Sequence, residues 1–342
     1  MKVQAFNSAM EWLLDEFDNP SVRFLTLRDL TDLDEDFPIF LEARKEAHHS
    51  DPIARILDNM HPEGYWSKPG PGYSPKYRST VWAIILLAQL GGSVKEDSRI
   101  SDACDYLMDH AYAEGGYFSH SGAPGGTFDC LQGNLCWAIM KLGYKDLRLL
   151  EAFDWLARSQ IGEGIAAKED KQAFPRYYAY KCGPNFQCGA NYNLPCAWGA
   201  EKVLRAFSIL PVKLRTEPIN RAIQLGVDFF FSVEPTPAAW PYHDRINNTW
   251  WKFGFPIFYN TDLLQVAETL AALGYADDPR LVPLMDYIES KMDDEGKWIL
   301  EHDYKDKTWG NYGKKGQPNK WVTLRALRAL CARDLNHHFT YS

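Results

Sequence analysis

Residues 182–210 read CGPNFQCGANYNLPCAWGAEKVLRAFSIL, and this stretch contains both halves of the pattern that decides the fold. Its first part is rich in Gly, Pro and Asn, which is typical of a loop. Its second part, 195–210, is strongly apolar, and Pro195 would lie in the first turn of a helix. The stretch therefore predicts a loop that leads into a buried helix.

The same combination recurs along the chain, with a period of about 50–65 residues. Strongly apolar segments occupy 78–90, 130–142, 195–210, 261–273 and 320–331. Half-polar segments alternate with them at 49–60, 98–112, 147–159, 217–232 and 279–292. An apolar helix must be buried, whereas a half-polar helix can cover it. The alternation predicts an all-α fold with inner helices wrapped by outer ones.

Two architectures satisfy this alternation, a closed α/α toroid of about five to six helical hairpins and an open helical solenoid. The large Trp and Phe content of the inner helices favours closure around a shared centre. We expect one domain, in which helices within 1–48 pack on a toroid formed by 49–342. Pro20 would start the second of these N-terminal helices, with Asn19 or Asp18 as its cap.

Composition excludes several function classes. The 342 residues are 46% hydrophobic and 14% aromatic, which is too rich in core residues for a disordered chain. The formal net charge is −8 without any basic run, so we expect no nucleic-acid partner. No apolar run approaches about 18 residues, so we expect no membrane span. Seven cysteines without a secretion signal predict a reduced, cytoplasmic protein.

Turns that close the half-polar helices carry a Gly-aromatic motif: HPEGYW at 61–66, AEGGYF at 113–118 and DDEGKW at 293–298. These turns resemble the repeat motif of squalene–hopene cyclases and of protein prenyltransferase β-subunits. The segment from about 50 to 332 is similar to bacterial prenyltransferase/squalene-cyclase repeat proteins of an uncharacterised branch. The resemblance implies a terpenoid-cyclase-like α/α toroid. One fold hosts many chemistries, so the resemblance does not name a reaction.

In such a toroid the loops that lead into the inner helices would converge on one mouth. Aromatic residues recur in these loops together with a few ionisable groups, which is typical of a small-molecule pocket. The competing interpretation is that helix starts are simply polar, with Asp129, Asn193 and Asn260 as caps. The predicted substrate-binding residues are Tyr73, Arg78, Tyr192, Trp198, Phe255, Phe258 and Trp321.

Acid–base residues are also present at these helix starts. Asp129 and Asp262 are isolated acids, and burial would raise the pKa of either carboxyl while a helix N-terminus would lower it. The apolar run FGFPIFY before Asp262 favours a proton donor there. Tyr259 and Tyr77 would relay protons or orient the substrate.

Cysteines offer a second chemistry. Cys130, Cys182, Cys188 and Cys196 could together bind zinc, and Cys130 or Cys196 could act as a nucleophile or acid. Prenyltransferase β-subunits hold zinc with an Asp two residues before a Cys and with a His. Here Asp129 is adjacent to Cys130, and no His lies at the start of an inner helix, although His243 is in a neighbouring loop. Cys104, Cys136 and Cys331 lie on apolar faces and read as core residues.

Three hypotheses follow. The first is an enzyme with an aromatic-lined cavity that acts on a small hydrophobic or isoprenoid-like molecule by acid–base cyclisation, isomerisation or lyase chemistry, with no cofactor required. The second is a zinc-dependent prenyltransferase-like or thiol-activating enzyme that uses Cys130 and the Cys182–Cys196 cluster. The third is a non-catalytic helical scaffold that binds a partner. The long loop 161–194 could cover the mouth as a lid.

Overall fold

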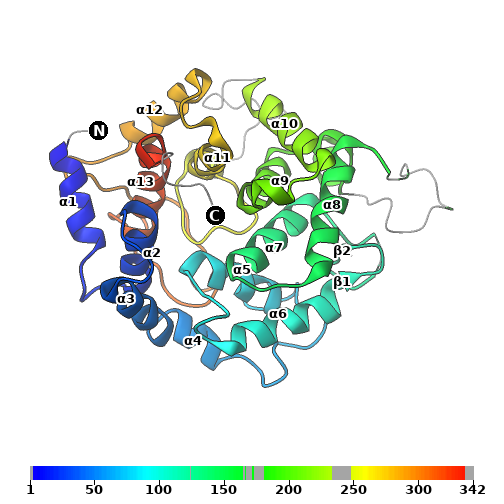
Figure 1. Ribbon diagram of the computed structural model, residues 1–342, viewed down its shortest axis with the longest axis horizontal. Helices are drawn as coiled ribbons and strands as arrows, with labels where there is room; N and C mark the ends of the chain where they lie inside the picture. The colour runs from blue at the N-terminus through cyan, green and yellow to red at the C-terminus, as the bar shows by residue number, and fades with distance from the viewer. Residues whose placement is uncertain are drawn as a thin grey trace. The chain divides into compact units, whose positions relative to one another are not determined.

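The computed structural model describes residues 3–123, 125–164, 166, 172, 181–232 and 248–335. Over these residues the chain is mostly helical, with two short two-stranded sheets (Figure 1). None of the described helices is both long enough and apolar enough to cross a bilayer. His243 and much of the expected lid loop lie outside the described residues.

The chain divides into two compact units. Unit 1 comprises Met1–Asn59, Gln89–Gly92 and Asn248–Ser342, and unit 2 comprises Met60–Ala88 and Ser93–Asn247. The predicted division at residue 48 and the closed toroid stay predictions.

Unit 1 combines the N-terminal helices with the last inner and outer helices. Its elements are α1 (Val3–Leu13), α2 (Pro20–Leu30), α3 (Pro38–His49), α4 (Ile53–Asp58), a 3-10 turn η5 (Asn248–Trp251), α11 (Leu263–Leu270), a π segment (Ala271–Tyr275), a 3-10 turn (Pro279–Leu281), α12 (Val282–Ser290) and α13 (Lys320–Leu335). Helix α2 packs against α3 and α13. Pro20 does start α2, and the side chain of Asn19 caps it by accepting the amide of Val22 at 3.3 Å.

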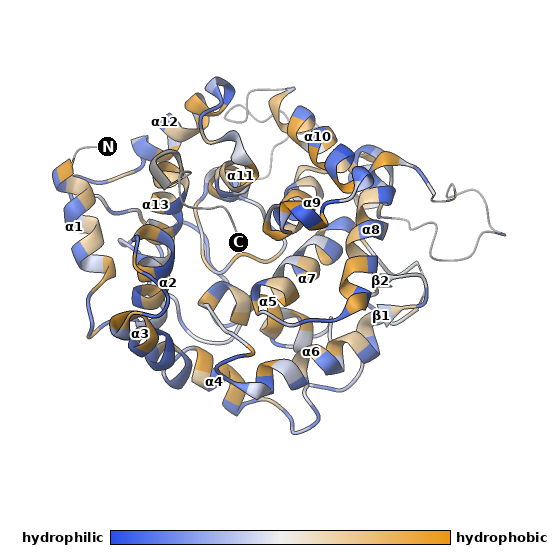
Figure 2. Ribbon diagram, viewed as in Figure 1, coloured by the Kyte–Doolittle hydropathy of each residue, from blue (hydrophilic) through white to orange (hydrophobic). Residues whose placement is uncertain are grey.

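Unit 2 contains the other three inner helices. Its elements are α5 (Thr80–Leu90, whose last two residues count with unit 1), α6 (Ser98–Ala111), β1 (Tyr112–Ala113), β2 (Tyr117–Phe118), α7 (Asp129–Lys141), α8 (Leu147–Ile161), a 3-10 turn η2 (Pro184–Phe186), β3 (Gln187–Cys188), a 3-10 turn η3 (Gly189–Asn191), β4 (Leu194–Pro195), α9 (Ala197–Ile209), a 3-10 turn (Val212–Leu214) and α10 (Glu217–Phe231). Both sheets are antiparallel. In Figure 2 apolar residues colour much of α5, whereas α10 mixes polar and apolar residues, as the sequence predicts.

Helices α7 and α9 approach each other unusually closely at Gly133. A methyl group added there would lie 2.3 Å from the backbone carbonyl of Lys202. Real carbon atoms do not approach so closely, so this crossing requires glycine. Beside it, Lys202 and Glu201 form a fully buried ion pair at 3.0 Å. The apolar pattern of the segment predicts the buried helix but not this pair.

The Gly-aromatic turns share one backbone conformation. Their glycines, Gly64, Gly116 and Gly296, have φ values of 92°, 87° and 79°, which favour glycine. Two residues later the chain buries an aromatic side chain, which is Trp66, Phe118 and Trp298 in turn.

The backbone amide after each such turn also finds an equivalent partner. It donates to a side chain in the first turn of the following inner helix. These bonds are Trp66 N to Thr80 Oγ1 at 3.2 Å, Phe118 N to Gln132 Oε1 at 3.0 Å and Trp298 N to Thr323 Oγ1 at 3.0 Å. The sequence repeat is therefore a structural repeat, in which each turn is anchored to the start of an inner helix.

Candidate functional site

The predicted site residues divide between the two units. The starts of α5, α7 and α9 belong to unit 2, and those of α11 and α13 belong to unit 1. Each group is described by itself, and their convergence on one mouth stays a prediction.

A short hairpin in unit 2 brings Cys188 next to Cys196. Strands β3 and β4 pair Gln187 with Pro195 and Cys188 with Leu194. The Asn193 amide donates to the Cys188 carbonyl at 3.0 Å, and the Cys196 amide donates to the Phe186 carbonyl at 2.9 Å. Four residues of this segment take left-handed backbone conformations: Asn185, Phe186, Tyr192 and Asn193.

The two half-buried thiols of this hairpin form a hydrogen-bonded pair. Cys188 has its pKa lowered to about 6, first by the hydrogen bond with Cys196 and further by the backbone amides of Ala190 and Asn191 and by Lys181, against the effect of burial. The same hydrogen bond and burial raise the pKa of Cys196. At neutral pH Cys188 is therefore the thiolate, and the Cys196 thiol donates to it.

Two further thiols lie within electrostatic reach of this pair. Burial raises the pKa of half-buried Cys130 to about 12, and the neighbouring Cys188 and Asp129 act in the same direction. Buried Cys182 has its pKa raised by burial and by Asp129, to which its thiol donates a hydrogen bond. Both thiols therefore hold their protons more tightly than Cys188 does.

Asp129 ties this thiol cluster (Cys130, Cys182, Cys188 and Cys196) to two helices. Its carboxylate accepts from Gln160 Nε2 of α8 at 2.9 Å. The same Gln160 accepts the Phe186 amide of the hairpin at 3.0 Å. Asp129 is the first residue of α7 rather than its cap. It therefore positions the thiols, and this role follows from contacts that the sequence does not reveal.

The three expected caps at these helix starts were wrong. The residues that cap α7, α9 and α11 are Phe128, Cys196 and Asp262, not Asp129, Asn193 and Asn260. Helix α7 begins one residue earlier than its expected cap suggests, whereas the loops before α9 and α11 are three and two residues longer. Before α9, backbone bonds such as Cys196 N to Phe186 O hold the added residues outside the helix.

An aromatic wall borders the thiol cluster. Tyr73 packs against Trp82, His120 and Phe128, with ring centroids 5.4, 5.4 and 5.6 Å away. Tyr77 contacts Trp82 at 4.8 Å. Cys130 interacts electrostatically with Tyr73, whose pKa is raised chiefly by burial. The predicted residues Tyr73 and Tyr77 thus lie in one cluster next to Cys130.

Two lysines cover this aromatic wall. The Nζ of Lys76 lies 5.2 Å from the ring centre of Tyr73, and the Nζ of Lys181 lies 5.7 Å from that of Phe128. Burial lowers the pKa of Lys76, and it lowers that of His120 as well. Sequence reasoning missed Lys181 and His120 as site residues. Lys181 directly precedes Cys182, which is the one local signal that could have found it.

The remaining predicted residues of unit 2 lie at the edges of this region. Tyr192, at the tip of the hairpin, is 59% exposed. Trp198 is half-buried in the first turn of α9, and Arg78 is exposed just before α5. Their role in substrate binding stays a prediction. Cys104 and Cys136 are buried core residues as expected, whereas Cys331 is half-buried.

In unit 1, Asp262 is locked in an ion pair. Arg325 of α13 donates to both carboxylate oxygens at 2.9 Å. The amides of Gly254 and Gln265 donate to the same carboxylate at 3.2 and 2.8 Å. Burial alone would raise the pKa of Asp262, but Arg325 and these amides lower it. The expectation that apolar surroundings make Asp262 a proton donor was therefore wrong.

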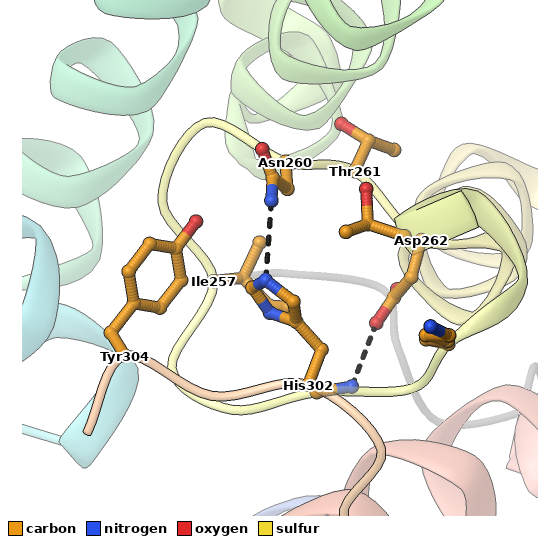
Figure 3. Close-up of a pocket in the computed structure, with 9 residues that line it drawn as sticks. Ile257, Asn260, Thr261, Asp262, His302 and Tyr304 are labelled. Atoms are coloured by element: carbon orange, nitrogen blue, oxygen red, sulfur yellow. Dashed lines mark hydrogen bonds between the residues drawn. The ribbon is translucent and has the colours of Figure 1, made fainter. Parts of the chain in front are cut away.

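Figure 3 shows the small cavity beside Asp262, whose volume is about 10 Å³. Asn260 Nδ2 and His302 Nε2 lie 3.3 Å apart on its wall, and burial lowers the pKa of His302. The cavity is large enough for about one water molecule. It does not accommodate a substrate, and the relay through Tyr259 stays a prediction.

The aromatic residues of unit 1 form a second cluster. Phe255 stacks on Trp321 with a centroid distance of 4.2 Å, and Tyr312 packs edge-on against Phe255 at 5.1 Å. Phe258 contacts Tyr304 at 4.9 Å. Phe255, Phe258 and Trp321 are all buried.

The zinc hypothesis for the thiol cluster stays a prediction. Within the described ranges, no three His, Cys, Asp or Glu side chains are placed as ligands of one metal ion. Cys182 is engaged with Asp129, and Cys188 shares a proton with Cys196.

Comparison with known proteins identifies no relative of this chain. Neither a scan of the chain against protein-family models nor a search of curated proteins finds a match.

Proposed function

We propose that this protein is a thiol-dependent enzyme in which the Cys188 thiolate attacks an electrophilic carbon of a small hydrophobic molecule. The observation that carries the proposal is the Cys188–Cys196 pair. One hairpin holds a half-buried thiolate with a pKa of about 6 beside a thiol that keeps its proton. A thiolate that is favoured at neutral pH and partly accessible is what covalent catalysis by cysteine requires.

The chemical step uses both sulfurs. Cys188 forms a C–S bond to the electrophilic carbon of an activated alkene. The electron pair displaced from the double bond takes the proton of Cys196, which becomes the thiolate, and the former double bond can now rotate as a single bond. Return of that proton to Cys196 and cleavage of the C–S bond restore the double bond, release the geometric isomer of the substrate and regenerate the starting thiol pair. No oxidant or metal is needed for this sequence.

The aromatic wall supports the proposal that the substrate is hydrophobic. Tyr73, Tyr77 and Phe128 offer ring faces beside Cys130, and the cationic groups of Lys76 and Lys181 lie over two of these rings. Such a surface suits an apolar body with one polar, electron-poor end. Lys76 and Lys181 are placed to stabilise negative charge on that end.

The α/α toroid and the resemblance to prenyltransferase/squalene-cyclase repeat proteins belong to the same proposal. They are supported by the alternation of apolar and half-polar helices and by the repeated anchoring of each Gly-aromatic turn. The acid–base hypothesis is less well supported, because its candidate proton donor Asp262 is an ion-paired anion. Asp129 instead supports the thiols.

The first experiment measures alkylation of each cysteine by iodoacetamide as a function of pH, with peptide mass spectrometry as the readout. We expect Cys188 to react fastest and to reach half of its maximal rate near pH 6. Cys331→Ser is the matched control, because Cys331 is also half-buried but lies on α13. A midpoint near the ordinary thiol value of about 8.5 would contradict the proposal.

The second experiment tests the substrate class. Small alkyl and aryl α,β-unsaturated ketones are incubated with the protein, and adducts on Cys188 are quantified. Tyr73→Ala should slow the aryl probes about ten-fold while leaving iodoacetamide unaffected, and Phe17→Ala, which changes a residue that is 97% exposed, should change neither. Equal slowing of all probes would argue against a binding wall. Stoichiometric zinc that is lost in Cys188→Ser would favour the zinc hypothesis instead.

A further inference from the structure

The hairpin of unit 2 places Cys188 and Cys196 on one face. Cys188 pairs with Leu194 in the short sheet, and the Cys196 amide continues the ladder by donating to the Phe186 carbonyl at 2.9 Å. The backbone of Cys196 is extended, and side chains alternate along an extended strand, so residues 194 and 196 project from the same face as Cys188. Cys188 and Cys196 are therefore diagonal neighbours across the two strands, and the hydrogen bond between their sulfurs joins them.

Closure of this pair into a disulfide requires only a small movement. In a disulfide the two sulfurs lie about 2.05 Å apart and the two Cβ atoms about 3.5–4.5 Å apart. Sulfurs that share a hydrogen bond already lie near contact. Residues 192–194 at the tip of the hairpin are exposed, so few packing contacts oppose the shift that brings the two strands together.

The other two thiols of the cluster are held by different parts of the chain. The buried thiol of Cys182 donates to the carboxylate of Asp129. Cys130 is the second residue of α7, outside the hairpin, and it interacts with Cys188 electrostatically. Cys196 is therefore the sulfur that is placed to meet Cys188.

Cys188 is the sulfur of this pair that an oxidant would attack first. It is half-buried, so a small molecule can reach it. The backbone amides of Ala190 and Asn191 donate to its sulfur and stabilise the thiolate, with help from the charge of Lys181. The thiolate is the form of cysteine that reacts with hydroperoxides, and oxidised cysteines with a second thiol beside them close into disulfides.

We propose that Cys188 and Cys196 form a redox pair that reduces a small hydroperoxide and closes into a disulfide. The Cys188 thiolate attacks the terminal peroxide oxygen and the O–O bond breaks, which leaves a sulfenic acid on Cys188 and an alkoxide or hydroxide that takes a proton from water. The Cys196 sulfur then forms the S–S bond as the S–O bond breaks, and the departing hydroxide takes the Cys196 proton and leaves as water. Both sulfurs are oxidised, and the peroxide is reduced by two electrons. An external thiol reopens the pair by disulfide exchange.

The disulfide would also switch off the thiol chemistry of the same site. It consumes both the Cys188 thiolate and the proton of Cys196, which attack on an activated alkene requires. This consequence rests on the proposed function, whereas the disulfide itself does not.

The test is disulfide mapping by peptide mass spectrometry. The fully reduced, full-length protein is treated with an equimolar amount of hydrogen peroxide, and the remaining thiols are blocked with N-ethylmaleimide. Trypsin would leave three cysteines of the cluster on one peptide, because the sequence contains no Lys or Arg between Lys181 and Lys202. Chymotryptic cleavage after Phe186, Tyr192 and Trp198 separates them.

We expect one linked product, which joins the Cys188 and Cys196 peptides and disappears on treatment with dithiothreitol. In Cys196→Ser, oxidation of Cys188 should stop at the sulfenic acid, which dimedone traps. Cys188→Ser should consume the peroxide about ten-fold more slowly than the wild type. Cys331→Ser is the matched control and should form the same disulfide, because Cys331 is also half-buried but lies on α13.

Other products would overturn the proposal. A sulfinic acid on Cys188 with Cys196 still free would show that the two sulfurs do not close, and a link from Cys188 to Cys130 or Cys182 would identify a different partner. Oxidation spread evenly over the cysteines would show that no redox pair exists. Alkylation of Cys188 with a midpoint near pH 6 but no disulfide would refute the redox pair and leave the proposed function standing. A disulfide without any adduct from the unsaturated ketones would support the redox pair and refute the proposed function.

Discussion

Asp262 in unit 1 caps α11 and Asp129 in unit 2 is the first residue of α7, so both lie at helix starts, yet their surroundings differ sharply. Asp262 accepts four charged or backbone donors and faces the guanidinium of Arg325. Asp129 accepts from the neutral amide of Gln160 and the thiol of Cys182.

The difference teaches where chemistry can occur in this fold. In unit 1 the buried charge is fully compensated, and a compensated ion pair stabilises without exchanging protons. In unit 2 the negative charge at neutral pH lies on Cys188, and one shared proton with two backbone amides stabilises it. The Cys188 thiolate can react because its partner, the Cys196 thiol, can transfer a proton. The Asp262 carboxylate cannot react in this way because its partner is the guanidinium of Arg325.

The largest expected effect comes from breaking the ion pair in unit 1. Arg325→Met leaves Asp262 buried without its cation, and we expect a loss of about 3–5 kcal/mol in the free energy of unfolding, measured by urea denaturation. Arg280→Met is the control, because its pair with Asp278 is on the surface and contributes at most about 1 kcal/mol. A loss in Arg325→Met no larger than in the control would refute this view of Asp262.

The next effect is the acid dependence of stability. The pKa of Asp262 is lower in the folded protein than in the unfolded chain. Its contribution to the free energy of unfolding is therefore complete above the unfolded pKa of about 3.9 and is lost as the pH falls through the lower folded pKa. The stability of the wild type should therefore fall more steeply below pH 4 than that of Asp262→Asn, whose overall stability is lower. Parallel pH curves for the two proteins would contradict this assignment.

A smaller effect should follow from removing the proton donor of unit 2. In Cys196→Ala, the pKa of Cys188 should rise from about 6 toward its ordinary value, so the midpoint of its alkylation moves to higher pH. The lowered folded pKa also means that Cys188 stabilises the protein above about pH 8.5 and that this contribution is lost as the pH falls toward 6. Thermal unfolding across pH 5–9 should show this slope in the wild type and not in Cys188→Ala.

Asp129→Asn should have the smallest effect. The amide retains an oxygen that can accept from Gln160 or Cys182, so we expect about 1 kcal/mol of destabilisation. This contrasts with Asp262→Asn, which disrupts an ion pair. A loss above about 3 kcal/mol in Asp129→Asn would show that the two aspartates are energetically alike. The measurement is urea denaturation of both variants under one condition.

The helices of this protein could be predicted from the sequence because burial has a clear pattern. The segment 98–112 became α6 at Ser98–Ala111, and 217–232 became α10 at Glu217–Phe231. Gly-aromatic turns could be predicted as well, since left-handed backbone favours glycine. Asn19 and Pro20 marked a helix start by their own chemistry.

The chemistry of the candidate site could be predicted only in part. The crowding of cysteines in 182–196 pointed to the right segment, but the Cys188–Cys196 pair depends on left-handed conformations at Phe186 and Tyr192 that these residue types do not signal. Arg325 lies 63 residues from Asp262 in a segment read as an apolar helix. Contacts between distant segments, such as this one, determine which aspartate is ion-paired. A local sequence pattern does not predict them.

The crossing of α7 and α9 has a consequence for how this sequence can vary. The atom that a side chain at Gly133 would strike is a main-chain carbonyl, which is the same whatever residue occupies position 202. A substitution at 133 therefore cannot be suppressed by a compensating substitution at 202. In a deep mutational scan, position 133 should be intolerant in every genetic background, while position 202 should tolerate replacements when its buried partner Glu201 is changed with it.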